Sequence, residues 1–260
     1  MKINLTDTHT HLYLDPFDKD IDEVISRAKE AGVERMFLPN LDSSSVGGML
    51  ELCKRHRGTC FPMIGLHPTS VGEQFREELE FMEAQLQQEI YIAVGEIGID
   101  LYWDKTFLQQ QQEAFSIQIK LARAHGLPIV IHARESFEEI FAIMDKEADD
   151  GLTGVFHSFT GGAKELEKVL SYGFYVGING IVTFKNSGLD RIVAEFIPPE
   201  KLLLETDAPF LAPVPYRGKR NESAYVRNVA EKVAEVYGMT TGEVAELTTV
   251  NAKNLFKKAF

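Results

Sequence analysis

Two histidines stand two residues apart near the start of the chain, in the segment DTHTHLYLD that begins at Asp7. Alternate residues of a β-strand point to the same side, so His9 and His11 could present their imidazoles to one ion if this segment is extended. A single histidine at a strand end is usually a hydrogen-bonded structural residue. The H-x-H spacing is therefore informative only if other segments supply further ligands.

Other histidines and carboxylates occur where apolar segments end: Glu96 in VGEIG, His132 in VIHA, His157 in VFHSF and Asp207 in LLLETDAP. Each has an ordinary alternative, such as a turn carboxylate for Glu96 or a helix N-cap for Asp207. Together with the H-x-H pair, however, four of the seven histidines and two carboxylates take the same place relative to predicted strands. That coincidence favours metal binding over independent structural roles.

The elements that would position these side chains are short apolar or β-branched segments alternating with amphipathic helical stretches. The predicted strands are residues 3–9, 35–41, 60–67, 91–98, 128–133, 154–159, 174–179 and 202–207. Two helices should follow the last strand, and the final one opens on TTGE (240–243), a capping-box pattern. This pattern predicts an α/β fold, a single-domain (β/α)₈ TIM barrel over residues 1–260. A doubly wound open sheet is the alternative, but no Gly-rich phosphate loop follows the first strand.

In a TIM barrel the C-terminal ends of the strands share one rim, where active sites are built. Six ligands are more than one catalytic metal takes while keeping an open position, so we expect two divalent metal ions. The predicted metal ligands are His9, His11 and Asp207 for the first ion, His132 and His157 for the second, and Glu96 between them.

The composition limits the partners. A net charge of −12 argues against a broad basic surface for nucleic acid, where a pI above about 9 is expected. Two divalent ions would offset two carboxylates and a bridging hydroxide, so a phosphate could still bind through the metals. No segment suits a membrane span, a secretory signal is not evident, and the cysteines at 53 and 60 are read as reduced thiols. We expect a cytoplasmic protein with no membrane association and no obligate protein partner.

Eight stretches also match a known family in order along the chain: DTHTHL (7–12), GLHP (65–68), AVGEIGIDLYWD (93–104), IVIHAR (129–134), VFHSFTG (155–161), LLLETDAP (202–209), RGKRNE (217–222) and TTVNAKNLF (248–256). With them the chain resembles the TatD family of metal-dependent deoxyribonucleases, within the amidohydrolase-like barrel superfamily. The resemblance implies a binuclear barrel that hydrolyses DNA phosphodiester bonds, and the same six ligands. The chain departs from the family pattern at Thr69, where members often have histidine, and at Ser223, where they usually have proline. Substrate preference is the property that these loop departures affect.

The expected reaction is attack of a metal-bridging hydroxide on phosphorus, with an exonuclease mode open. Asp207 and Glu96 are the predicted catalytic carboxylates, and Asp207 is the candidate for taking the proton from water. Asp7 and Glu205 lie on ligand-bearing segments and are predicted to orient the ligands. The resemblance suggests Mg²⁺ for nuclease activity, while imidazole ligands also suit Zn²⁺ or Mn²⁺.

Residues near the predicted rim could contact the substrate. Tyr102 and Trp103 could stack on a base or simply pack in their loop. The predicted phosphate or backbone contacts are His67, Arg134, Arg217, Lys219 and Arg220, although a turn role, a salt bridge of Arg134 with Glu135 or Glu138, and solvated surface charge are the ordinary alternatives. An alternative function keeps the binuclear barrel but acts on an amide, lactone or small phosphoester.

Overall fold

The computed structural model describes residues 3–149 and 151–260, in which strands and helices alternate. The strands are β1 (Leu5–Asp7), β2 (Val33–Pro39), β3 (Cys60–Met63), β4 (Val94–Asp100), β5 (Ile129–Arg134), β6 (Gly154–Phe156), β7 (Tyr175–Ile178) and β8 (Leu202–Leu204). The α-helices are α1 (Ile21–Glu30), α2 (Ser43–Arg55), α3 (Phe75–Leu86), α4 (Leu108–Ala124), α5 (Phe137–Glu147), α6 (Ala163–Ser171), α7 (Leu189–Phe196), α8 (Val226–Tyr237) and α9 (Thr241–Leu255). Short 3₁₀ segments are η1 (Asp15–Phe17), η2 (Pro68–Ser70), η3 (Gly180–Thr183), η4 (Pro199–Lys201), η5 (Ser223–Tyr225) and η6 (Lys257–Ala259).

The strands form one closed ring. β1, β2 and β3 pair in parallel, and β4 to β8 pair in parallel in chain order. Backbone bonds cross both seams. Gly95 N–H of β4 donates to the carbonyl of Ile64, directly after β3, at 2.8 Å. Thr8 N–H, directly after β1, donates to the Leu204 carbonyl of β8 at 3.0 Å. These bonds confirm the predicted TIM barrel.

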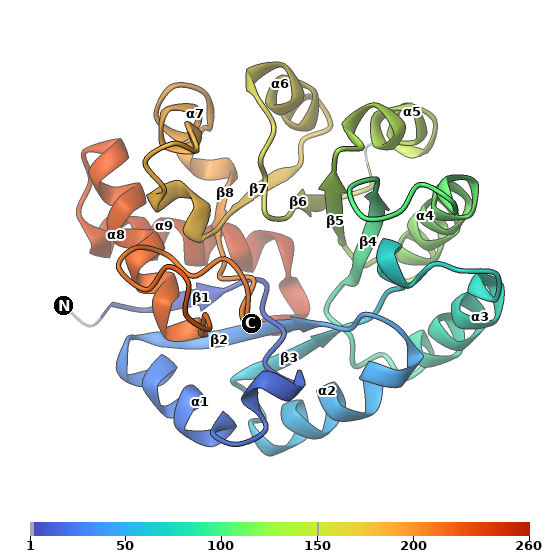
Figure 1. Cartoon of the computed structure of the whole chain (residues 1–260), viewed down its shortest axis with the longest axis horizontal. Helices are drawn as coiled ribbons and strands as arrows, with labels where there is room; N and C mark the ends of the chain where they lie inside the picture. Colours follow the sequence, from blue (N-terminus) through green and yellow to red (C-terminus); the bar gives the residue numbers. More distant parts are fainter. Residues whose placement is uncertain (1–2, 150) are drawn as a thin grey trace.

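The helices surround the strands, as Figure 1 shows. The C-terminal helices (red) lie beside β1 (blue), and Thr249 of α9 donates its hydroxyl hydrogen to the Asn4 carbonyl at 3.2 Å. α9 begins with the predicted capping box, in which Thr240 Oγ1 accepts from Glu243 N–H and the Glu243 carboxylate accepts from Thr240 N–H. The residues before β1 are thus held against α9.

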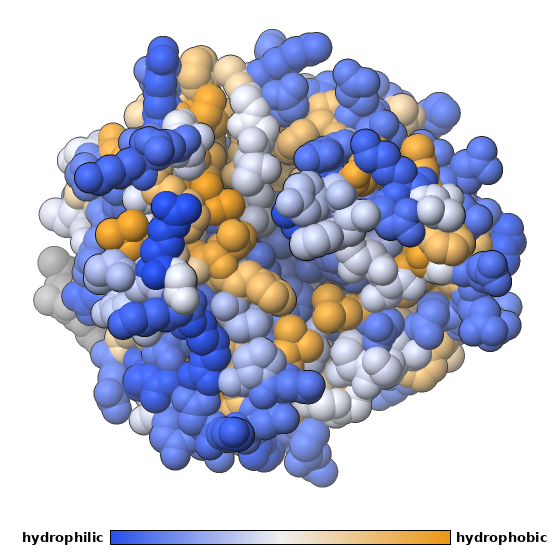
Figure 2. All heavy atoms as spheres, in the orientation of Figure 1, coloured by the Kyte–Doolittle hydropathy of each residue, from blue (hydrophilic) through white to orange (hydrophobic). Residues whose placement is uncertain are grey.

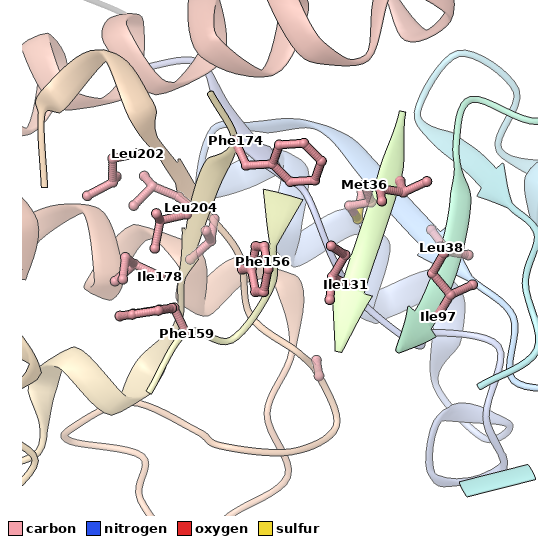
Figure 3. Close-up of a cluster of buried hydrophobic side chains, with 14 of the residues drawn as sticks. Met36, Leu38, Ile97, Ile131, Phe156, Phe159, Phe174, Ile178, Leu202 and Leu204 are labelled. Carbon is pink, nitrogen blue, oxygen red and sulfur yellow. The ribbon is translucent and has the colours of Figure 1, made fainter. Parts of the chain in front are cut away.

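The main hydrophobic core lies between the strands and the helices. Figure 3 shows part of this layer, in which Ile131, Phe156, Ile178 and Leu204 come from four successive strands and are fully or almost fully buried. Burying such a side chain is worth about 1.5–3 kcal/mol relative to leaving it exposed. This layer holds each strand in place and so sets the position of any residue at its end.

A second, smaller cluster fills the inside of the barrel. Because strand residues alternate between two faces, Val130 belongs to this inner cluster while its neighbours Ile129 and Ile131 belong to the outer core. The inner cluster is formed by Phe37, Met63, Ile92, Ala93, Val130, Val155, Leu203, Ala252, Leu255, Phe256 and Ala259. Residues from α9 and η6 therefore close one end of the barrel. The predicted metal ligands lie at the other end, where the strands end.

One predicted boundary is wrong in a way that matters for the site. The strand predicted at 91–98 is β4 at Val94–Asp100, so Glu96 lies inside the strand and Asp100 ends it. The strand extends further because Ile99 and Asp100 pair in register with Ala133 and Arg134 of β5. Glu96 and Asp100 consequently project from the same face of β4.

Candidate metal centre

One carboxylate joins two pairs of histidines at the C-terminal ends of the strands. Glu96 Oε2 is 3.1 Å from His9 Nε2 and 3.6 Å from His11 Nε2. The other oxygen, Oε1, is 2.6 Å from both His132 Nδ1 and His157 Nε2. The predicted position of Glu96 between two groups of ligands is therefore present in the geometry.

Asp207 completes the first group. Its Oδ1 is 3.9 Å from His9 Nε2 and 3.6 Å from His11 Nε2, and these two nitrogens are 3.2 Å apart. The Asp207 side chain is 14% exposed whereas that of Glu96 is 3% exposed, so Asp207 is the carboxylate nearer to solvent. The six predicted ligands, far apart in the sequence, are all brought together.

The charge of this cluster is strongly interdependent. Burial acts to raise the pKa of Glu96, but His157, His67 and His9 outweigh it and hold that pKa well below its usual value. Burial acts to lower the pKa of His157, yet Glu96 and Glu205 raise it well above its usual value. For Asp207, burial dominates and raises the pKa to about 6. The negative charge of Glu96 and the charge of the imidazoles around it thus depend on one another.

The nitrogen and oxygen atoms of the cluster fit a divalent ion. His132 Nε2 lies 2.9 Å from Asp100 Oδ2, and if it donates there, the lone pair of Nδ1 faces Glu96 Oε1 at 2.6 Å. His9 Nε2 and His11 Nε2 likewise approach each other with room for at most one shared hydrogen. Imidazole nitrogens and carboxylate oxygens that converge in this way are the donor set of Zn²⁺, Mn²⁺ and related ions. Among the described residues, the groups His9–His11–Glu96 and His67–Glu96–His132 each have ligand atoms within 4.8 Å of one another.

Asp100 was missed by sequence reasoning. Besides its contact with His132, its Oδ1 accepts the backbone N–H groups of Tyr102 at 2.9 Å and Trp103 at 3.4 Å. A carboxylate on the far side of a ligating imidazole fixes its tautomer and orientation. The signal was available, since Glu96 and Asp100 are separated by an even number of residues on one strand, as His9 and His11 are.

A second omission is Tyr13. Its hydroxyl lies 3.1 Å from His11 Nδ1 and donates to the Pro39 carbonyl at 2.6 Å. Because the hydroxyl hydrogen is used on Pro39, the oxygen is free to accept Nδ1–H of His11. Tyr13 follows His11 by two residues, but nothing in the sequence shows that the chain turns back over the imidazole.

His67, predicted as a phosphate contact or a turn residue, lies beyond the end of β3 and contacts Glu96 of the cluster. Thr69 donates its backbone N–H to His67 Nδ1 at 3.2 Å, which makes Nδ1 an acceptor and leaves the hydrogen on Nε2. Nε2 therefore donates to Glu96 Oε1 at 3.2 Å. The Thr69 hydroxyl also lies 2.6 Å from Nδ1 and can donate to it, so the residue that departs from the family pattern supports the same tautomer of His67.

Asp7 and Glu205 lie behind the cluster. The Asp7 carboxylate accepts from Thr206 N–H at 2.9 Å and from Thr206 Oγ1 at 2.6 Å, next to Asp207. Burial raises the pKa of Asp7 to about 7. Glu205 accepts from Ser158 N–H, and its Oε1 is 3.6 Å from His157 Nδ1. Both carboxylates contact residues adjacent to or within the cluster, which suits an orienting role.

β7 passes very close to Glu205. A Cβ added at Gly177 would lie 2.4 Å from Glu205 Oε2, so only glycine leaves room for this carboxylate at that point. The backbone of β7 thereby helps to confine the buried group that faces His157.

The predicted substrate-contact residues have different environments. The guanidinium of Arg220 donates to both carboxylate oxygens of Asp20, at 2.6 and 2.7 Å, and to the Pro16 carbonyl, so it anchors its loop within the protein. Arg217 lies over the ring of Phe184 at 4.2 Å, and Lys219 is exposed. Among the described residues, no ion pair joins Arg134 to Glu135 or Glu138; its guanidinium lies 3.8 Å from the Tyr102 ring centre instead.

The loop after β8 passes across the barrel in the view of Figure 1, and Figure 2 shows this face with a largely hydrophilic hollow near its middle. Chemically, the arrangement joins convergent metal-ligand atoms with an open face and nearby cationic side chains. No helix in the described part of the chain is both long and apolar enough to cross a membrane.

A parallel eight-stranded barrel with histidines and carboxylates at the C-terminal rim defines the class of metal-dependent barrel hydrolases. Within that class, the chain belongs to the TatD related DNase family, whose model matches residues 6–257. It is a metal-dependent hydrolase of this family, as the predicted resemblance implies.

Several relatives support the assignment. The chain is 40% identical over 253 residues to an "Uncharacterized metal-dependent hydrolase YabD" of Bacillus subtilis, covering 97% of this chain and 99% of that protein. It is 34% identical over 259 residues to a "3'-5' ssDNA/RNA exonuclease TatD" of Erwinia tasmaniensis, covering 98% and 97%. The solved structure of YJJV, a TatD homologue of Escherichia coli K12, superposes with a TM-score of 0.92 at 27% identity over 99% of both chains.

Proposed function

We propose that this TatD-family hydrolase is a deoxyribonuclease that cleaves phosphodiester bonds from a strand end. The observation that carries the proposal is the double contact of Glu96, whose two oxygens each meet a separate pair of histidines. A two-ion site of this kind suits in-line displacement at phosphorus. Relatives named as 3'-5' ssDNA/RNA exonucleases support the same choice of substrate.

The proposed ligands of the first ion are His9, His11 and Asp207, those of the second are His132 and His157, and Glu96 is shared. When bound, a pair of divalent ions supplies Lewis-acid activation of water and charge stabilisation at the phosphate. We assign Mg²⁺ to the nuclease reaction, while the four imidazoles also accommodate Zn²⁺ or Mn²⁺.

The protein's own groups have separate tasks in this proposal. Asp207, the more exposed carboxylate, accepts the proton of the attacking water. Glu96 would act as an ionised ligand, since its two oxygens contact both pairs of histidines. His67 Nε2–H, which donates to Glu96 Oε1, would donate to a phosphate oxygen instead when substrate is bound. Arg217 and Lys219 contact the nucleic-acid backbone; Arg220 instead holds the loop in place through Asp20.

The decisive experiment follows cleavage of end-labelled single-stranded and double-stranded DNA after chelation and readdition of Mg²⁺, Mn²⁺ or Zn²⁺ separately. Successive loss of terminal nucleotides from the labelled strand, restored by an added ion, is the expected result. Internal fragments would replace the exonuclease assignment by an endonuclease. Turnover of an amide, lactone or small phosphoester with intact DNA would overturn the proposal and establish the alternative hydrolase.

The cationic loop provides an independent test. Arg217→Ala with Lys219→Ala should weaken binding of single-stranded DNA and reduce the slope of log affinity against log salt by about 1.4, from about 0.7 per phosphate contact. The matched control is Arg55→Ala with Lys146→Ala, which removes two exposed cations from the last turns of α2 and α5, at the opposite end of the barrel. Equal salt slopes for the two double variants would exclude the loop from DNA contact.

A further inference from the structure

Three exposed side chains lie close together beside the candidate metal centre. We define the rim platform as Tyr102, Trp103 and Arg134. Trp103 is 70% exposed and Tyr102 is 50% exposed, and Trp103 is the most exposed of the large hydrophobic residues described. Exposing an indole to water is unfavourable, so its position at the rim calls for a partner.

The platform is an ordered stack. The guanidinium carbon of Arg134 lies 3.8 Å from the Tyr102 ring centre and 5.4 Å from the Trp103 ring centre. The two aromatic rings meet edge to face, with centres 4.8 Å apart and an interplanar angle of 89°. The Arg134 guanidinium covers a face of Tyr102, while the indole of Trp103 is 70% exposed. A cation and an open aromatic surface are thereby presented side by side, and unpaired nucleobases stack on such aromatic surfaces.

The platform is tied to the metal centre through Asp100. One oxygen of this carboxylate contacts His132 Nε2 at 2.9 Å, and the other accepts the backbone N–H groups of Tyr102 and Trp103. Arg134 follows His132 by two residues on β5 and pairs in register with Asp100. A single buried side chain therefore sets both the imidazole and the turn that displays the rings.

Charge also favours a nucleic-acid occupant. The whole chain carries a net charge of −12, yet Arg134 is exposed, stacked on a ring and, among the described residues, not ion-paired with its acidic neighbours. Such a guanidinium attracts a phosphate while its plane supports a base. A nucleotide uses both features, because its phosphate pairs with the cation and its base stacks on the exposed ring.

We propose that the rim platform stacks an unpaired base of single-stranded nucleic acid and so holds the strand beside the metal centre. This inference rests on the proposed nuclease function and specifies its substrate form. Bases inside a duplex have both faces covered by their neighbours, so only an unpaired or frayed end can use the platform. Aromatic stacking tolerates any base, which predicts weak sequence preference and preference for single strands.

Trp103 makes the binding step directly visible, because it is the one tryptophan in the sequence. The metal-loaded full-length protein is titrated with a hexanucleotide whose linkages are phosphorothioates, so that turnover is slow, and its tryptophan emission is recorded. Quenching by the single strand, and much less by a blunt duplex of the same sequence, is the expected result. Emission that does not respond to the single strand overturns the inference.

A kinetic test separates stacking from chemistry. Trp103→Ala should raise KM for single-stranded DNA about 10-fold, as expected for loss of one base–aromatic stack, with a much smaller effect on kcat. Trp103→Phe should recover most of the loss, because it restores a ring face. KM for methyl 4-nitrophenyl phosphate, which carries no base, should change far less than KM for DNA.

Phe196→Ala is the matched control, since Phe196 is an aromatic residue of similar exposure (45%) at the end of α7. Its KM for DNA should equal that of the parent protein. Equal KM values for Trp103→Ala and Phe196→Ala, with DNA cleavage intact, overturn the platform and leave the nuclease assignment standing. Quenching by single strands without cleavage in the presence of any ion would support the rim platform and overturn the proposed nuclease function.

Discussion

The two ends of the barrel interior are built from the same strands but have opposite chemistry. On β5, Val130 lies in the apolar inner cluster and His132, two residues later, lies in the candidate metal centre. The same spacing separates Val155 from His157 around the end of β6. Two residues span about 6.6 Å along a strand. An inward-facing apolar residue is therefore followed, at the next inward-facing position, by a residue of the candidate metal centre. We therefore expect substitutions at the apolar end to change the free energy of unfolding, and substitutions at the polar end to change the rate of the reaction.

The largest effect should come from Asp207→Asn at the polar end. The substitution keeps the size of the side chain but removes the proposed proton acceptor, so kcat for single-stranded DNA should fall about 10³-fold. The melting temperature should stay within a few degrees. Asp18→Asn, at an exposed carboxylate, is the control and should retain full activity. Wild-type turnover by Asp207→Asn would remove this residue from the proposed mechanism.

The apolar end should respond in the opposite way. Phe256 is fully buried and packs against Phe37 with ring centres 4.9 Å apart. Phe256→Ala should therefore lower the free energy of unfolding by about 3–5 kcal/mol, measured by urea denaturation. Its kcat per folded molecule should be unchanged, and the exposed Phe196→Ala should alter stability by about 0.5 kcal/mol or less. A loss of kcat equal to that of Asp207→Asn would show that the two ends are not separable.

Metal removal tests the polar end without a mutation. An ion that binds only the folded protein stabilises it by about 2.7 kcal/mol at 100 times its Kd, so chelation should lower the melting temperature by roughly 5–10 °C. The same decrease should be seen in Phe256→Ala, because distant contributions add. An unchanged melting temperature in chelator, with activity retained, would contradict the metal centre.

Glu205→Gln should have the smallest effect of the four. It weakens the partner of His157 Nδ1 without removing a proposed ligand, and such changes lower metal affinity or activity about 10- to 100-fold. Metal retained after dialysis against a weak chelator measures the affinity. Glu200→Gln, at an exposed position of η4, should retain metal like the parent. Equal retention by both variants would limit Glu205 to a structural role.

The sequence predicts the barrel and the six convergent residues because both follow from local periodicity. Alternation within a strand and the shared rim of parallel strands are enough to place His9 and His132 near one another. The even spacing of Glu96 and Asp100 was equally readable, but the predicted end of β4 at residue 98 hid it. Boundaries depend on pairing with β5, which is not local.

Contacts between loops were beyond the reach of the sequence. Arg220 reads as a free cation in RGKRNE, yet the structure pairs it with Asp20, 200 positions away. The contact of Tyr13 with His11 depends on the path of the chain after β1. A run of basic residues in the sequence shows where cations cluster. Only the fold shows which of these cations are paired with carboxylates of the protein itself.

The seam between β8 and β1 affects when the candidate metal centre can form during synthesis of the chain. The first histidine pair belongs to the start of the chain and Asp207 lies across the seam, where Asp7 and Thr206, 199 positions apart, are hydrogen-bonded. A nascent chain emerging from the ribosome therefore lacks one side of the first ligand group until most of the protein has been made. The proposed metal centre is therefore complete only after the ring of strands has closed.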